Sequence, residues 1–176
     1  MKTLKDYHIQ QDRYDGCSLA SFLMIRNHIT QSRKTQKGFR TELEKMGHPW
    51  VHDRRGVYVK TLQRYINQYL EEKLPDWECT RCYSRNLSNY EFDLLLNTSS
   101  IYTIFNYDGH YSPLGLAPTG IKKDYDLTIY DVDWVQDYSR EFTYKLGEGE
   151  YVVSYPSFLR KLKRQKRSIL YIRRRE

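Results

Sequence analysis

A change in the spacing of apolar residues near Ser100 is the feature that most constrains the fold. Before Ser100, apolar residues recur at intervals of three and four, as at Val59, Leu62 and Ile66, which is the period of an amphipathic helix. After it, short runs of β-branched and aromatic residues such as "IYTIFNY" are separated by turn residues, which is typical of strands. Helices followed by strands predict an α+β fold, with N-terminal helices packed on a C-terminal antiparallel sheet.

The expected elements follow this division of the chain. Helices are expected over 17–29, 41–46, 57–74, 89–97 and 156–166, and strands over 101–107, 110–116, 127–134, 141–146, 150–155 and 168–172. Pro113 falls within the second strand and predicts an edge strand or a bulge, because proline donates no ladder hydrogen bond. No internal repeat or low-complexity linker divides the sequence, so a single domain over 1–176 is the simplest organisation.

The first helix is expected to lie at the centre of the domain. Apolar residues occupy nearly every face of the segment "CSLASFLMIRNHI", and a helix of that kind is usually buried. Asp15-Gly16 ahead of it is a turn signal, and Asp15 is the expected N-cap. Cys17 therefore belongs to the first turn of a buried central helix.

The composition limits the class of protein. Hydrophobic residues make up 39% of the 176 residues and aromatic residues 15%, which is enough for a packed core. No apolar run approaches the roughly 20 residues of a membrane-spanning helix, and the N-terminus lacks the apolar segment of a secretory signal. We therefore expect a cytoplasmic protein with no membrane contact. The three cysteines cannot all pair, and free thiols are expected in a reducing compartment.

Cys17 is a candidate nucleophile because of its place in the helix. The positive end of a helix stabilises a thiolate. The backbone N–H groups of the first turn lack intrahelical acceptors, so they can bind a developing oxyanion. Gln11, six residues earlier, offers a side-chain amide as a second oxyanion donor. The candidate base is His110, which begins a strand after the turn "NYDG".

The strand "LTIYDVDW" offers a carboxylate to orient this base. Alternation puts Asp131 and Asp133 on the apolar face of the strand, and two carboxylates there indicate a strand that runs out of the core into a site. If the preceding loop spans 117–126, His110 lies opposite Asp133 and diagonal to Asp131. The spacing leaves the choice between the two aspartates open.

Together these residues resemble the papain-like cysteine peptidases, specifically the bacteriocin-processing peptidases for double-glycine leaders and their stand-alone relatives. The resemblance rests on Gln11 and Cys17 with five residues between them, the "GHY" motif around His110, an alternating strand that ends in Asp131, and the closing segment 151–172. In that family the cysteine attacks and the histidine is the base, which implies these roles for Cys17 and His110. An aspartate orients the histidine and the glutamine completes the oxyanion hole, which implies those roles for Asp131 and Gln11.

The resemblance implies a papain-like fold and a hydrolase that acts through a thioester acyl-enzyme, with a protein or peptide as substrate and no cofactor. Peptidase or isopeptidase activity is expected, because most relatives with this arrangement cleave peptides. An acyl-transferase that uses the same thioester is an alternative. A second alternative is a non-enzymatic module of the same fold that binds nucleic acid or an acidic protein.

A basic C-terminal segment bears on that second alternative. The net charge of +7 favours anionic partners, and the helix expected over 156–166 contains a run of Lys and Arg residues that could contact nucleic acid or an acidic protein. Phe158, Leu159 and Leu162 have helical spacing within it. That spacing favours an amphipathic helix docked on the sheet, with its basic face in solvent.

Cys79 and Cys82 raise the question of a metal site. They have the spacing of half a zinc site, and His48 and His52 are also spaced as ligands. However, two histidines before two cysteines is not the order of a common zinc finger, and one CxxC pair is a weak signal. We therefore expect free cysteines and no bound metal.

Overall fold

The structure, a computed structural model, describes residues 4–13, 16–52, 57–88, 90–91, 100–107, 110–116, 126–130, 144–147, 150–154, 160 and 168–176. Its helices are η1 (Leu4–Tyr7), α1 (Cys17–Ile29), α2 (Gln36–Lys45), η2 (Pro49–His52), α3 (Val59–Lys73) and η3 (Ser84–Asn86). Its strands are β1 (Trp77–Tyr83), β2 (Ile101–Tyr107), β3 (His110–Leu116), β4 (Asp126–Tyr130), β5 (Tyr144–Gly147), β6 (Glu150–Ser154) and β7 (Ser168–Arg174).

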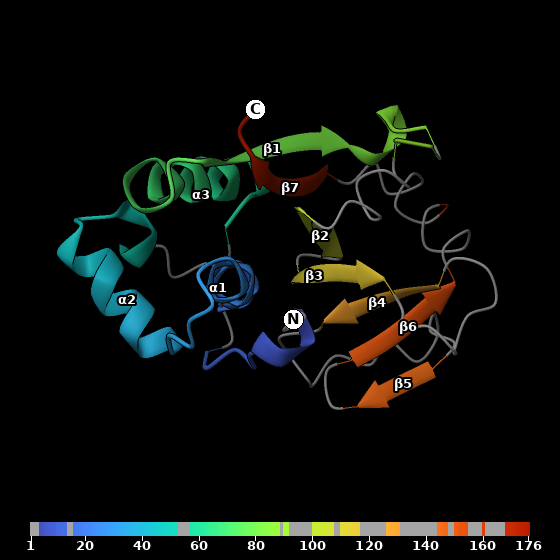
Figure 1. The fold of residues 1–176 in the computed structure, drawn as a ribbon, viewed down its shortest axis with the longest axis horizontal. Helices are drawn as coiled ribbons and strands as arrows, with labels where there is room; N and C mark the ends of the chain where they lie inside the picture. Colours follow the sequence, from blue (N-terminus) through green and yellow to red (C-terminus); the bar gives the residue numbers. More distant parts are fainter. Residues whose placement is uncertain are drawn as a thin grey trace.

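The α+β class is confirmed. Three N-terminal helices pack on an antiparallel sheet whose strand order is β1-β7-β2-β3-β4-β6-β5. Figure 1 shows α1 and α3 beside the part of the sheet formed by β1, β7, β2 and β3, with α2 on the far side of α1 from the strands. Buried side chains of the helices form one core cluster with residues of these strands, including Ile104, Tyr111 and Leu170. The face of the sheet that carries these three residues is called the helix face below.

The beginning of α2 differs from the prediction. The helix begins at Gln36 rather than at residue 41, because the side chain of Thr35 caps it and accepts a hydrogen bond (3.1 Å) from the N–H of Gly38. α3 matches its prediction to within two residues at each end. The helices predicted over 89–97 and 156–166 lie outside the described residues, apart from residues 90, 91 and 160.

The strands predicted after residue 100 are found within the described residues, whereas the predicted stretches 131–134, 141–143 and 155 lie outside them. One strand was not predicted. β1, with the sequence "WECTRCY", has polar residues on both faces, so it lacks the alternation by which a strand is recognised. β7 lies between β1 and β2 and pairs antiparallel to both. The C-terminal strand therefore joins two strands that are distant from it along the chain.

Pro113 lies in an interior strand, which corrects the prediction of an edge strand. β3 has β2 on one side and β4 on the other. Pro113 pairs with Ile104 of β2, and the described ladder between β3 and β4 covers Leu114–Leu116. The described ladder to β4 therefore ends one residue short of the proline, which has no N–H to donate to it.

α1 is buried on all sides, as predicted. Each of residues 17 to 25 is 7% exposed or less. The ring of Phe22 contacts Phe39 of α2, Trp50 of η2 and Tyr69 of α3, with ring centroids between 5.5 and 6.0 Å apart. Aromatic pairs at this separation stabilise a core beyond the area that they bury. Phe22 therefore anchors α1 to the other helices.

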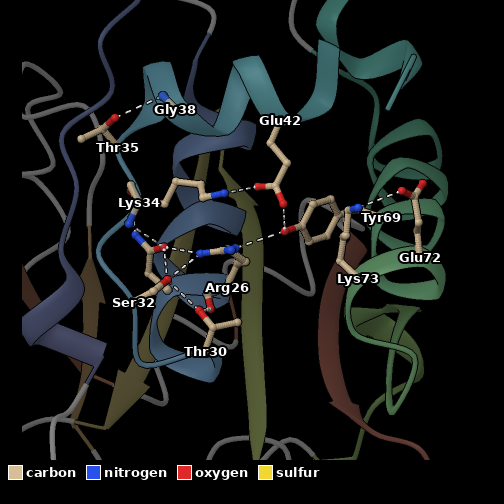
Figure 2. A network of polar contacts seen from close by, with 11 residues as sticks. Arg26, Thr30, Ser32, Lys34, Thr35, Gly38, Glu42, Tyr69, Glu72 and Lys73 are labelled. Carbon is tan, nitrogen blue, oxygen red and sulfur yellow. Dashed lines mark hydrogen bonds and ion pairs between the residues drawn. The ribbon is translucent and has the colours of Figure 1, made fainter. Parts of the chain in front are cut away.

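A polar network also joins the three helices (Figure 2). The Nε of Arg26 in α1 donates to the hydroxyl of Tyr69 in α3 (3.1 Å), and that hydroxyl donates to Glu42 of α2 (3.3 Å). The ammonium of Lys34 lies 2.7 Å from the other carboxylate oxygen of Glu42. Burial raises the pKa of Tyr69, so its hydroxyl keeps the proton that it donates. These contacts hold α1 in one position relative to α2 and α3.

Candidate active site

Cys17 is the first residue of α1. Gly16 occupies the N-cap position, with φ −86° and ψ −2° and no side-chain cap, whereas the predicted cap, Asp15, lies outside the described residues. The first backbone hydrogen bond of the helix joins the N–H of Ala20 to the carbonyl of Gly16 (2.9 Å). The N–H groups of residues 17, 18 and 19 therefore have no acceptor within the helix, and the thiol lies at the positive end of the helix dipole.

The direction of α1 brings Cys17 to the end of the sheet where β3 begins. Near the C-terminal end of α1, Nδ1 of His28 lies 2.6 Å from the hydroxyl of Tyr102, at the start of β2. Nearer the N-terminal end, the hydroxyl of Ser21 donates to the backbone carbonyl of Tyr111 in β3 (2.9 Å). Cys17 lies one turn before Ser21, about 6 Å further along the helix. α1 therefore runs along the β2–β3 hairpin, with its thiol end at the turn of that hairpin.

His110 is the first residue of β3 and is 5% exposed. It pairs with Tyr107, the last residue of β2. Because side chains alternate along a strand, Tyr111 lies on the helix face and His110 lies with Ser112 on the opposite face. Cys17 and His110 are thus brought to the same end of the sheet. The thiol of Cys17 and the imidazole of His110 can therefore meet only around the end of β3, because the strand itself separates the helix face from the face that carries His110.

Gln11 lies close to the N-terminus of α1. A Cβ atom added at Gly16 would lie 3.5 Å from Cβ of Gln11 and 3.6 Å from Nη2 of Arg40. Gln11 is partly buried, so its side chain leaves the backbone beside the residue that precedes Cys17. This position is compatible with the predicted role of a second oxyanion donor.

The two candidate aspartates, Asp131 and Asp133, lie outside the described residues. The strand that leads to them is described up to Tyr130. Leu116 pairs with Leu127, which is the register implied by the predicted loop. Since β4 runs antiparallel to β3, Tyr130 is nearer than Leu127 to the end of β3 that carries His110. That one of these aspartates orients His110 stays a prediction, and the choice between them stays open.

Two residues of α2 that the sequence did not single out contact the segment around Gln11. The side-chain amide of Gln36 donates to the carbonyl of Gln10 and accepts from the N–H of Asp12 (3.2 Å). The guanidinium of Arg40 forms an ion pair with the carboxylate of Asp12. Both contacts join residues far apart in sequence, so no local pattern indicates them.

Cys79 and Cys82 do not face a common site. Both lie on β1, and positions three apart on a strand point to opposite faces of the sheet. Burial raises the pKa of the Cys79 thiol, and it raises the pKa of the Cys82 thiol to about 11. Among the described residues no group of three or more His, Cys, Asp or Glu side chains could hold a metal ion.

His48 is a buried structural histidine. Its Nδ1 accepts from the backbone N–H of Trp50 (3.2 Å), so Nε2 carries the proton and donates to the carbonyl of Tyr65 (3.1 Å). Both nitrogens of the neutral ring are thus engaged. Burial lowers the pKa of His48, although the hydrogen bond to Tyr65 and the charge of Glu72 oppose this effect.

This lowered pKa predicts a loss of stability in mild acid. Between the folded-state pKa and the ordinary value of 6.5, the unfolded chain binds more protons than the folded one, so the free energy of unfolding falls as the pH drops through this window. His48→Asn keeps an acceptor for Trp50 and cannot titrate, so urea unfolding at about pH 7.5 and about pH 5.5 should show a smaller difference in midpoint. His52→Asn, at an exposed position, is the matched control, and an equal effect of both variants would contradict the assignment.

The basic segment predicted over 156–166 lies outside the described residues except for Arg160, which is exposed. The structure therefore leaves the predicted contact with nucleic acid or an acidic protein as a prediction. As for membranes, no helix in the described part of the chain has both the length and the apolar character that crossing one requires.

Comparisons of the chain with protein-family models, with curated proteins and with solved structures gave no match. The likeness to papain-like peptidases therefore stays a prediction from the sequence.

Proposed function

We propose that the protein is a papain-like cysteine hydrolase that acts on an amide bond of a protein or peptide, as a peptidase or isopeptidase. The hydrogen bond between Ser21 and the carbonyl of Tyr111 carries the proposal. It joins α1, one turn after Cys17, to β3, one residue after His110, and so supports a place for both residues at one end of the sheet. The thiol lies at the N-terminus of α1, where backbone N–H groups without intrahelical acceptors are available to a developing oxyanion.

Acylation is the first step of the proposed reaction. His110 takes the thiol proton of Cys17, and the resulting thiolate attacks the carbonyl carbon of the substrate and forms a tetrahedral intermediate with a negatively charged oxygen. The backbone N–H of Cys17 and the side-chain amide of Gln11 donate to this oxygen. The C–N bond then breaks, and His110 gives a proton to the departing amine. The acyl group remains on Cys17 as a thioester.

Deacylation completes the cycle. His110 takes a proton from a water molecule, whose oxygen attacks the thioester carbonyl. The C–S bond breaks and the carboxylic acid product leaves. Cys17 regains its free sulfur beside His110, which carries the proton taken from water. Asp131 or Asp133 orients the imidazole in both steps. An amine in place of water leads to acyl transfer from the same thioester, so an acyl-transferase differs from a hydrolase only in the acceptor.

Selective alkylation of Cys17 tests the proposal without a known substrate. The thiols of Cys79 and Cys82 are protonated near neutral pH, because burial raises the pKa of both. We expect iodoacetamide to modify Cys17 at least tenfold faster than either at about pH 7, since the thiolate is the reactive form. Mass spectrometry of peptides from the modified chain measures the three rates.

Equal modification of the three cysteines would contradict an enzymatic role and favour the non-enzymatic alternative. A matched variant, Cys82→Ser, removes the more accessible of the two other thiols. It is expected to leave the rate at Cys17 unchanged, which separates reactivity at Cys17 from a general opening of the fold.

A further inference from the structure

We infer that α2 positions Gln11, through Gln36 and Arg40, for its role as an oxyanion donor. The inference rests on the proposed function, and it assigns a role to two residues whose contacts are otherwise unexplained. Both residues belong to one face of α2, because positions four apart lie one above the other on a helix.

Gln36 holds the backbone on both sides of Gln11. Its amide nitrogen donates to the carbonyl of Gln10, and its amide oxygen accepts from the N–H of Asp12. One planar amide thus binds the two peptide groups that flank Gln11, in the way a neighbouring strand would. Gln36 is 7% exposed, so water competes little for these hydrogen bonds.

Arg40 adds a second attachment one turn further along α2. Its guanidinium pairs with the carboxylate of Asp12, and its side chain is 16% exposed. Its Nη2 also lies 3.6 Å from the Cβ position of Gly16, the N-cap of α1. Arg40 therefore pairs with the segment that carries Gln11, and its guanidinium lies beside the position where a side chain at Gly16 would begin.

The cap of α2 fixes the place of Gln36. Thr35 caps the helix by accepting from the N–H of Gly38 (3.1 Å), as Figure 2 shows. Gln36 is the first helical residue after this cap, and Phe39 holds the same turn to α1 through its contact with Phe22. Gln36 is thus attached to a rigid element, which is what a positioning residue requires.

Two reactions of Cys17 separate positioning from general stability. Acylation by p-nitrophenyl acetate passes through a tetrahedral oxyanion: the thiolate attacks the ester carbonyl, p-nitrophenolate leaves, and an acetyl thioester remains. Alkylation by iodoacetamide displaces iodide at carbon and forms no oxyanion. The ratio of the acylation rate to the alkylation rate in the full chain therefore reports oxyanion stabilisation.

Gln11→Ala is expected to lower this ratio by about 10²-fold, the usual effect of removing one oxyanion donor. Gln36→Ala is expected to lower it by about tenfold and Arg40→Met by a few-fold, because a misplaced donor loses part of its effect. In the Gln11→Ala background, Gln36→Ala should lower it no further, since both changes act through one donor. The matched control is Gln63→Ala, which removes a hydrogen bond to the carbonyl of Cys79 and should leave the ratio unchanged.

The outcomes distinguish this inference from the proposed function. If Gln11→Ala lowers the ratio but Gln36→Ala and Arg40→Met both leave it unchanged, the positioning role is wrong and the proposed function stands. If Cys17 in the unsubstituted chain is not acylated, the proposed function fails, and the inference with it. If Gln36→Ala does not fold, Arg40→Met still tests the inference. Methionine retains the apolar part of the Arg40 side chain, so this variant loses the ion pair with Asp12 and keeps the packing.

Discussion

His110→Ala is expected to lower the rate of Cys17 acylation by p-nitrophenyl acetate by about 10²- to 10⁴-fold, the range for loss of a general acid or base. The same change should also remove the faster alkylation of Cys17 relative to Cys79 and Cys82, because the imidazole is the proposed acceptor of the thiol proton. Released p-nitrophenolate measures the first effect, and peptide mass spectrometry measures the second.

His28→Ala is the matched control for this experiment. His28 also belongs to the contact between α1 and the β2–β3 hairpin, and its loss removes the hydrogen bond to Tyr102. It lies at the opposite end of α1 from Cys17, so its replacement should reduce stability and leave the acylation rate unchanged. Equal rates for His110→Ala and the unsubstituted chain would show that His110 is not the base, a result compatible with its place on the face opposite Tyr111.

Phe22→Ala is expected to destabilise the protein by about 3–5 kcal/mol, the range for removing a large aromatic side chain from a core. Phe22 is fully buried and contacts Phe39, Trp50 and Tyr69 from three other helical segments. Its loss leaves a cavity at the point where α1 meets the rest of the helical layer. Urea unfolding followed by circular dichroism measures the change in the free energy of unfolding.

Tyr58→Ala provides the comparison for Phe22→Ala. Tyr58 is 85% exposed, so its replacement should change the free energy of unfolding by less than about 0.5 kcal/mol. If Phe22→Ala were as mild as Tyr58→Ala, the central position of α1 would be wrong. In that case the support that α1 gives to Cys17 would also need another explanation.

The cysteine chemistry proposed here depends on helices that the polar and aromatic contacts hold together. The Arg26–Tyr69–Glu42 network joins α1 to α2 and α3, and the same α2 carries Gln36 and Arg40. A substitution that loosens the packing of α2 should therefore displace Gln11 before it displaces Cys17. The position of Cys17 is held separately, by the hydrogen bond of Ser21 in α1. Oxyanion stabilisation is accordingly the most sensitive readout of damage to the helical layer.

The sequence predicted those features that local periodicity controls. Apolar spacing indicated the buried first helix with Cys17 at its start, and β-branched and aromatic residues on either side of a "DG" turn indicated β2 and β3 with His110 at their junction. The register of β3 with β4 was also predicted correctly as far as Leu116 and Leu127. The helix and the two strands depend on residues a few positions apart, and such residues determine which face of a helix or strand is apolar, whereas the register followed from the predicted length of the loop between β3 and β4.

Only the tertiary structure decided how distant segments meet. It placed β7 between β1 and β2, put Tyr111 rather than His110 on the face of the sheet that the helices cover, and joined Gln36 to the backbone beside Gln11 across 26 residues of sequence. No pattern of apolar and polar residues indicates such contacts, because a buried amide or a strand edge finds its partner only when the whole core has packed. The residue types of the candidate site could therefore be recognised from the sequence. Their arrangement in space, on which the proposed chemistry depends, was determined by the fold.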